Sequence, residues 1–258
     1  MARRIIDLSV SLQAGIASDP PGMQPRIEYV SHKEGALQLA AGFPGLTPAD
    51  LPGGEGWAIE HVAITTHNGT HMDAPWHYRS RDDAGAPMAT IDDIPLDWCF
   101  GPGVKLDFRA LADGHVVTPA QIDAELARIG HALAPGDIVL VNTAAGARYG
   151  HDDYIDRGCG MGRAATLCLT GRGVRVMGTD AWSWDAPFSA TRARYMRDRD
   201  ASIVWEGHFA GAAAPYCQIE KLANLDQLPA TGFDVISLPV KVHKGSGGWA
   251  RPVAILRD

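Results

Sequence analysis

The sequence has few cysteines and no long apolar run. The cysteines stand far apart, with no Cys-x-x-Cys pair, at Cys99, Cys159, Cys168 and Cys217. This spacing argues against a cysteine-based metal site and favours reduced thiols in a cytoplasmic protein. No stretch approaches the roughly 20 apolar residues of a membrane span, so we expect no membrane segment. Asp7 follows the N-terminal arginines too closely for a signal peptide.

Basic clusters and several common catalytic motifs are also missing. The formal net charge is −7 and no basic run occurs, so neither nucleic acid nor an anionic membrane is an expected partner. The sequence lacks a Gly-x-Ser-x-Gly elbow, a Walker A loop and a strand-linked Gly-x-Gly-x-x-Gly, which argues against serine hydrolases, P-loop enzymes and dinucleotide-binding enzymes. With 258 residues, of which 46% are apolar, the chain fits one globular domain over residues 1–258.

Hydrophobic patterns predict an α/β fold with a mixed, partly barrel-like sheet. Apolar runs at 137–142 and 174–179 indicate buried strands on either side of a helix at 163–170, an order typical of parallel pairing. Thr118, Pro119 and Gln121 mark the start of another helix, which ends at Gly130. Further strands are expected at 4–12, 26–31, 57–66, 103–108, 201–205, 219–222, 233–242 and 252–256. The segment 35–56 is interpreted as a pocket lid or a surface insertion, and 244–249 as a flexible loop.

The most informative stretch is His67-Asn-Gly-Thr-His-Met-Asp-Ala-Pro-Trp-His77. Imidazole nitrogens and a carboxylate oxygen at this density suit Zn²⁺, Mn²⁺ or Fe²⁺. On a strand, His67, His71 and Asp73 share one parity and can point to one side, whereas a helix would turn Asp73 away. We therefore predict that these three residues hold a catalytic divalent metal on an extended, kinked segment. Three protein ligands leave coordination positions open, as catalytic sites require.

The pattern His-x-Gly-Thr-His-x-Asp-x-Pro-x-His resembles the signature of the metal-dependent cyclase superfamily, which includes bacterial kynurenine formamidases and isatin hydrolases. The matching residues are His67, Gly69, Thr70, His71, Asp73, Pro75 and His77. The resemblance implies a swivelling β/β/α single domain, usually in a homo-oligomer such as a dimer or tetramer. It also supports His77 as general base and proton shuttle, a role that suits an imidazole near neutral pH. A fourth metal ligand, or a group that orients the ligands, is the alternative for His77.

Residues farther along the chain complete the predicted site. His208 and Glu220 look like the distant pair that forms a second metal position in the formamidase branch, with Asp73 bridging. Gln218 can face the same side of a strand as Glu220. If Gln218 is the group that faces the metal, only one metal binds, so one metal and two metals both stay open.

The tryptophans of the chain, one of which lies inside the motif, indicate a small aromatic substrate. Trp57, Trp76 and Trp182 are the expected substrate-binding side chains, because an aromatic wall suits a planar ligand. Trp76-His77-Tyr78 and the segment 215–221 look more like the isatin hydrolase branch, which implies opening of isatin to isatinate with Mn²⁺ favoured and Zn²⁺ as the alternative. The alternatives are hydrolysis of N-formylkynurenine and a module that binds metal or a small ligand without turnover.

Overall fold

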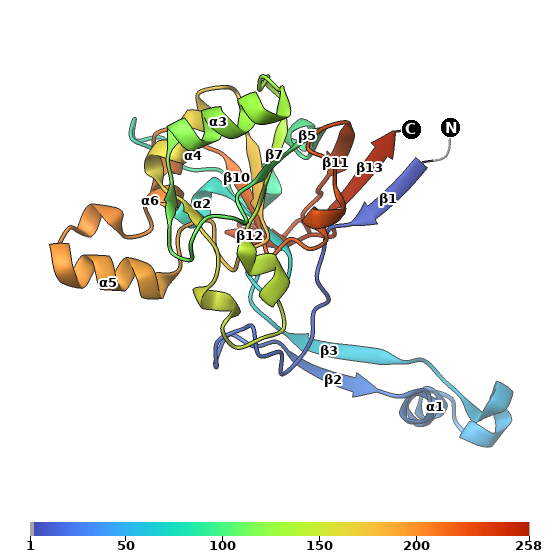
Figure 1. Cartoon of the computed structure of the whole chain (residues 1–258). Helices are drawn as coiled ribbons and strands as arrows, with labels where there is room; N and C mark the ends of the chain where they lie inside the picture. The colour runs from blue at the N-terminus through green and yellow to red at the C-terminus, as the bar shows by residue number, and fades with distance from the viewer. Residues whose placement is uncertain (1–2, 258) are drawn as a thin grey trace.

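The computed structural model describes residues 3–257, which form an α/β domain with one curled, half-barrel sheet and a projecting arm (Figure 1). In spatial order, the sheet contains β1 (Arg3–Asp7), β13 (Val253–Arg257), β11 (Phe233–Ile236), β5 (Phe100–Asp107), β7 (Ile138–Asn142), β9 (Val176–Thr179), β10 (Cys217–Glu220), β4 (His71–Asp73) and β12 (Gly247–Trp249). The neighbours β5, β7, β9 and β10 pair in parallel, and the outer strands pair antiparallel. The predicted mixed sheet is confirmed.

Both faces of the central strands are buried, which explains their continuous apolar sequences. In β7, Ile138 and Leu140 join one hydrophobic cluster, and Val139 and Val141 join the other. The second cluster is covered by helices α3 (Pro119–Ile129) and α4 (Arg163–Thr170). The remaining helices of the body are α2 (Pro75–Tyr78), α5 (Phe188–Asp198) and α6 (Glu206–Phe209), and a small parallel pair joins β6 (Val116–Val117) to β8 (Gly160–Met161).

The start and end of α3 follow the signals in its sequence. Thr118 accepts a hydrogen bond from the backbone N–H of Gln121, and the Gln121 side chain returns to the backbone N–H of Thr118, which completes a capping box. Gly130 ends the helix in the left-handed region at φ 67°. Ile122 and Leu126 are buried on the inner face. The prediction for this helix is confirmed at both ends.

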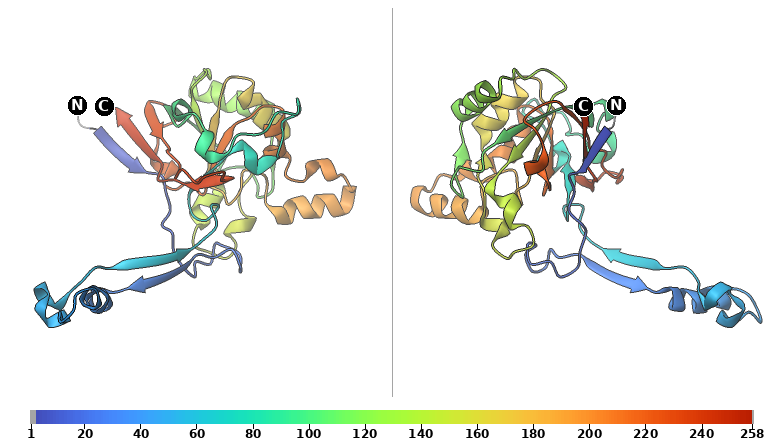
Figure 2. Two further views of the ribbon diagram at one scale, coloured as in Figure 1. Left: turned by 180° about the vertical axis from the view of Figure 1, so that it is seen from behind. Right: turned by 45° about the vertical axis from the view of Figure 1, so that its right-hand side comes forward.

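A long arm leaves the body between residues 26 and 63. It consists of the antiparallel pair β2 (Arg26–Val30) and β3 (Ile59–Ala63), with α1 (His32–Ala41) and two short 3₁₀ turns at its tip. Figure 2 shows that the arm points away from the sheet in both further views. The expectation that 35–56 covers the pocket of its own chain is therefore wrong.

Three further expectations also need correction. The first strand ends at Asp7 rather than continuing to residue 12. Residues 201–203 form a 3₁₀ turn, and Trp205 adopts φ 58° at the start of α6, so the expected strand at 201–205 is absent. The segment 244–249 is not a free loop, because β12 pairs with β4 beside the metal motif. Within residues 3–257, no helix has the length and apolar character needed to cross a membrane.

Candidate metal centre

The histidine motif folds as a turn, a short strand and one turn of helix. Gly69 adopts φ 58°, which lets the chain turn between His67 and β4. In β4, His71 and Asp73 lie on one side, as their parity predicted, and their partners in β10 are Glu220 and Gln218. Helix α2 then brings His77 back toward Asp73. The prediction of an extended segment is thus confirmed for His71 and Asp73 on β4, whereas His67 lies on a turn and His77 on helix α2.

Two of the predicted ligands, His67 and His71, each lie within direct reach of the third, Asp73. Nδ1 of His67 is 2.8 Å from Oδ1 of Asp73, and Nε2 of His71 is 3.3 Å from the same oxygen. On the neighbouring strand, a Cβ at Gly247 would lie 2.9 Å from Cε1 of His67 and 3.3 Å from Oδ1 of Asp73. Glycine at this position therefore leaves room for the two side chains.

These residues fit a divalent metal. Nε2 of His71 is buried without a hydrogen-bond partner and faces Asp73 and, at 3.6 Å, Oε2 of Glu220. An unpartnered imidazole nitrogen beside two buried carboxylates is the donor set expected for a metal ion. His67, Asp73 and His77 form one group of potential ligands, and His71, Asp73 and Glu220 form a second, so Asp73 belongs to both.

Burial and the histidines act in opposite directions on the charge of Asp73. Its side chain is fully buried, which raises the pKa, but the imidazoles of His71, His208 and His67 more than offset this and hold the pKa well below its usual range. Asp73 is therefore a carboxylate at neutral pH, the form that binds a cation.

His77 stands at the edge of the ligand cluster, with its side chain a quarter exposed. Its ring stacks on that of His67 at 4.0 Å between centroids and meets Trp205 edge-on at 5.1 Å. Burial lowers the pKa of His77 to about 4, although the Asp73 carboxylate opposes the shift. A neutral imidazole beside the ligands can accept a proton.

His208 is oriented by a carboxylate that the sequence reasoning missed. Oδ2 of Asp185 lies 2.5 Å from Nδ1 of His208, and the same carboxylate accepts hydrogen bonds from the backbone N–H groups of Gly207 and His208. Nε2 of His208 then faces Asp73 at 3.8 Å and Glu220 at 3.5 Å. Asp185 follows β9 by a short loop, and only the folded chain brings it to α6.

Gln218 lies between the groups that were expected to form a second metal position. Its amide nitrogen is 3.0 Å from Oδ2 of Asp73, 2.9 Å from Oε1 of Glu220 and 2.5 Å from Nε2 of His208. The hydroxyl of Tyr216 is 2.9 Å from the amide oxygen of Gln218, which orients the amide. Gln218 therefore contacts Asp73, His208 and Glu220, as expected for a residue that faces the same side of a strand as Glu220.

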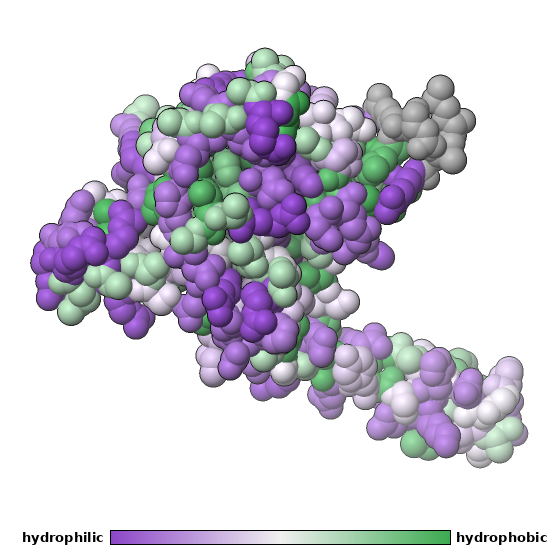
Figure 3. Space-filling model, viewed as in Figure 1, coloured by the Kyte–Doolittle hydropathy of each residue, from purple (hydrophilic) through white to green (hydrophobic). Residues whose placement is uncertain are grey.

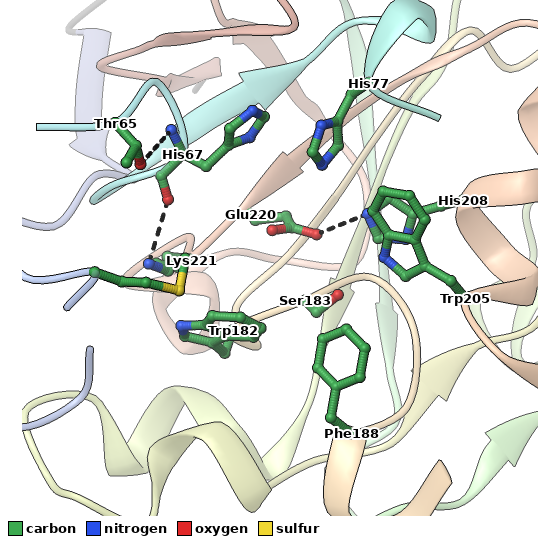
Figure 4. A pocket seen from close by; sticks show the side chains of 11 residues that line it. Thr65, His67, His77, Trp182, Ser183, Phe188, Trp205, His208, Glu220 and Lys221 are labelled. Atoms are coloured by element: carbon green, nitrogen blue, oxygen red, sulfur yellow. Dashed lines mark hydrogen bonds and ion pairs between the residues drawn. The ribbon is translucent and has the colours of Figure 1, made fainter. Parts of the chain in front are cut away.

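A cavity of about 280 Å³ opens beside the ligand cluster. Figure 4 shows His67 and His77 on one side and Trp182 and Phe188 on the other, with Trp205 alongside His208. Trp205 stacks on His208 with ring centroids 4.2 Å apart. The cavity therefore places aromatic walls next to the candidate ligands. Phe188 and Met23 also line it and were not foreseen, because nothing in their local sequence marks them.

Two of the three predicted substrate-binding tryptophans lie outside this cavity. Trp182 lines it, but Trp57 lies on the arm, where its indole nitrogen donates to Gln38, and Trp76 is 41% exposed on α2. Trp57 and Trp76 do not line this cavity, because Trp57 lies on the arm and Trp76 is exposed on α2, and their role in substrate binding stays a prediction. Trp184 is buried in the core.

Lys221, which lines the cavity, belongs to a buried ion pair. Nζ of Lys221 is 2.7 Å from Oδ1 of Asp19, and both side chains are almost fully buried. Lys221 directly follows Glu220 and adopts φ 57°. Thr70 donates to the backbone carbonyl of Lys221 at 2.7 Å, which ties this residue to the metal motif. The pair joins the N-terminal loop to the site.

Comparison with known proteins agrees with this geometry. The sequence matches the family described as "Putative cyclase" over residues 6–186. The chain belongs to this cyclase family. The matched range includes the whole histidine motif, Trp182 and Asp185. The family that the motif resembled is therefore confirmed.

Relatives of the cyclase-family chain include hydrolases. A kynurenine formamidase of Salinibacter ruber is 30% identical over 198 residues, which cover 76% of this chain and 78% of the relative. Isatin hydrolase A of Labrenzia aggregata is 26% identical, with a TM-score of 0.74 over 99% of this chain and 94% of the other. Isatin hydrolase A of Ralstonia solanacearum shares the fold, with a TM-score of 0.75, 24% identity and coverage of 99% and 92%. The chain is a hydrolase-type enzyme of the cyclase family, with residues suited to a metal.

Proposed function

We propose that this enzyme opens a small cyclic aromatic amide, isatin, to isatinate. The observation that supports this proposal most directly is the lining of the cavity, which is aromatic and offers no free basic side chain for a substrate carboxylate. Lys221 is the only Lys or Arg among the lining residues, and Asp19 already pairs with it. N-formylkynurenine carries a carboxylate that would need a basic partner, whereas isatin is uncharged and planar.

The size of the cavity and one relative support the same substrate class. At about 280 Å³ the cavity lies near the lower end of small-molecule sites, roughly 300–1,000 Å³, which favours a compact bicyclic ligand. The isatin hydrolase A that is 26% identical is described as bound to benzyl benzoate, an uncharged aromatic ester. Trp182, Phe188 and Trp205 would contact the faces and edges of such rings.

In this proposal His67, His71 and Asp73 hold a divalent metal, Mn²⁺ by preference and Zn²⁺ as the alternative. A metal bound there polarises the substrate carbonyl and makes a water molecule more acidic. Neutral His77 accepts a proton from the attacking water and returns it to the ring nitrogen when the carbon–nitrogen bond breaks. The aromatic walls orient the planar ring and exclude bulk water.

Arylformamidase activity is the second candidate, because the S. ruber relative is a kynurenine formamidase. Turnover of isatin and of N-formylkynurenine should be measured side by side on chelator-stripped protein refilled with Mn²⁺ or Zn²⁺. We expect metal-restored opening of isatin with the higher kcat/KM. Preference for N-formylkynurenine would contradict the lactam proposal and favour the formamidase, whereas no turnover of either by metal-loaded protein would reject both substrates.

A further inference from the structure

A second cavity, apart from the one beside the metal centre, opens beyond the carboxyl ends of β7 and β9. Its volume is about 510 Å³, well within the roughly 300–1,000 Å³ of small-molecule sites. Asn142, the last residue of β7, and Asp180, which directly follows β9, both line it, together with residues 222–226. We name this the strand-end cavity. Ligands of α/β sheets commonly bind beyond strand ends of this kind.

Two backbone segments separate the strand-end cavity from the cavity beside the metal centre. Asp180 and Leu222 line the strand-end cavity, whereas Trp182 and Lys221 line the other one. The backbone N–H of Lys221 donates to the carbonyl of Ala181 at 3.0 Å, which joins the two segments. Among residues 3–257, none lines both cavities, so a ligand in the strand-end cavity has a site of its own.

The polar part of this lining contains a buried acceptor that lacks a donor. Asn142 is 4% exposed; its Nδ2 donates to Oδ2 of Asp180 at 2.6 Å, but its Oδ1 has no hydrogen-bond partner. A buried amide oxygen without a partner is rare and costs free energy. A Cβ at Gly146 would lie 2.6 Å from Oδ2 of Asp180, so glycine leaves space beside this pair. Because Asn142 lines the cavity, a ligand there can supply the missing donor.

The charges of the lining favour a cation. Asp180 and Asp226 form no ion pair with any residue from 3 to 257, and Asp226 is exposed. Arg109 also lines the cavity, but Asp107 balances its charge, with Nε 2.9 Å from Oδ1 and Nη2 2.6 Å from Oδ2. Burial raises the pKa of Asp180 to about 7, a shift that a nearby cation would oppose.

Other parts of the lining are apolar or aromatic. Val10, Leu222 and Leu225 contribute aliphatic side chains, which favour contact with the carbon atoms of a ligand. Tyr149 contributes a ring, and the face of an aromatic ring attracts an ammonium group. Tyr149 belongs to the turns of residues 144–156, which are yellow-green in Figure 1, and Figure 3 shows strongly hydrophilic residues at the surface around them.

We propose that the strand-end cavity binds a small primary amine in its ammonium form. The ammonium donates to Oδ1 of Asn142 and pairs with the carboxylate of Asp180, and the charge of Asp226 adds attraction. The carbon body of the amine packs on Leu222 and Leu225. An anion would meet two carboxylates, and an uncharged alcohol would leave them without a counter-charge. The proposal does not depend on the substrate proposed for the metal centre.

Isothermal titration calorimetry on the Mn²⁺-loaded protein tests this site, with benzylamine and butylamine as probes. Both should bind once per chain with a Kd of roughly 0.1–1 mM, as expected for ligands of this size. Benzyl alcohol and benzoate have similar shapes without the ammonium, and should bind about tenfold more weakly or not at all. Equal binding of benzyl alcohol would overturn the proposal, as would no binding of either amine at millimolar concentration.

Four variants locate the bound amine. Asp180→Asn keeps the size of the side chain and should weaken benzylamine binding about tenfold or more, and Asp226→Asn should weaken it about twofold to fivefold. Ala144→Phe places a ring in the cavity and should abolish binding. The control is Asp152→Asn, because Asp152 is an exposed carboxylate on the same turns that does not line the cavity. Its affinity should equal that of the wild type.

The exposed position of Asp226 keeps the test decisive even if a buried variant fails to fold. Circular dichroism checks each fold, and Asp226→Asn should fold like the wild type because its side chain is exposed. Unchanged affinity in Asp226→Asn and in the folded members of the other two cavity variants would place the amine outside the strand-end cavity and overturn the proposal. An equal loss of affinity in Asp152→Asn would mean that only general surface charge attracts the amine, which also overturns it.

Discussion

The carboxylate of Asp185 holds the imidazole of His208, with Oδ2 at 2.5 Å from Nδ1, and so fixes which ring nitrogen faces Asp73 and Glu220. Burial lowers the pKa of His208, but Asp185 and the neighbouring carboxylates raise it well above its usual value. The orientation of a histidine beside a metal site commonly depends on such a partner. Asp185 is thus a positioning residue.

The change Asp185→Asn should weaken metal affinity about 10–100-fold, because an amide cannot orient His208 as a carboxylate does. Affinity should be measured by competition with a metal chelator. Asp137 offers a matched control, since it lies 3.0 Å from His131 in a similar pair outside the cavity. Asp137→Asn should leave metal affinity unchanged. Equal affinities for wild type and Asp185→Asn would show that the pair does not position His208.

His77→Asn should lower kcat about 10²–10⁴-fold and leave the metal bound, because His77 acts on a proton rather than on the metal. Metal content after desalting and steady-state kinetics decide between the two roles of His77. The exposed His151→Asn is the control and should match the wild type. Loss of metal together with activity would make His77 a ligand instead.

The Asp19–Lys221 pair should be important for stability. Asp19→Asn leaves the buried ammonium of Lys221 without its carboxylate, which should lower the free energy of unfolding by about 3–5 kcal/mol. Urea unfolding measures this change. The exposed pair Arg79–Asp83 is the control, and Asp83→Asn should change stability by about 0.5 kcal/mol or less. If both variants lose the same small amount, the buried pair has no special role.

Asp180 should make stability depend on pH. Burial raises the pKa of Asp180 to about 7, against hydrogen bonds from Thr143 and Asn142. The folded state therefore binds more protons than the unfolded state between pH about 4 and 7, and stability falls as pH rises through this window. The cost above pH 7 is on the order of a few kcal/mol, since each pKa unit corresponds to about 1.4 kcal/mol.

Asp180→Asn removes this titration. The stability of Asp180→Asn relative to the wild type should therefore rise between pH 5 and pH 8, whatever its value at pH 5. Urea unfolding at four pH values gives the slope for each protein. Asp97→Asn, at an exposed position, should run parallel to the wild type. A parallel course for Asp180→Asn as well would mean that Asp180 is already ionised at pH 5.

The local parts of the fold and site could be read from sequence. The α3 capping box depends on residues three apart, and the common side of His71 and Asp73 depends on strand parity alone. Residues 201–205 looked like a strand, but Trp205 instead turns into α6 and stacks on His208. That outcome depends on tertiary packing, which no local pattern encodes.

Contacts between residues that are far apart in the sequence could not be predicted from such local patterns. Asp185 reaches His208 only because β9 and α6 meet in the fold. Strand β12 is rich in glycine and shows no alternation, yet it pairs with β4, and Gly247 leaves the space that His67 and Asp73 occupy. Trp57 looked like part of an aromatic wall beside the metal, but it lies on the arm and does not line the cavity.

The most direct test of the account is the metal content of Asp73→Ala beside that of the wild type and Asp97→Ala. All three should be purified with Mn²⁺ or Zn²⁺, desalted and assayed by elemental analysis, with circular dichroism to check the fold. Because Asp73 belongs to both groups of potential ligands, the wild type and Asp97→Ala should retain metal, and Asp73→Ala should fold but retain none. Full retention of metal by Asp73→Ala would contradict the assignment of the metal centre.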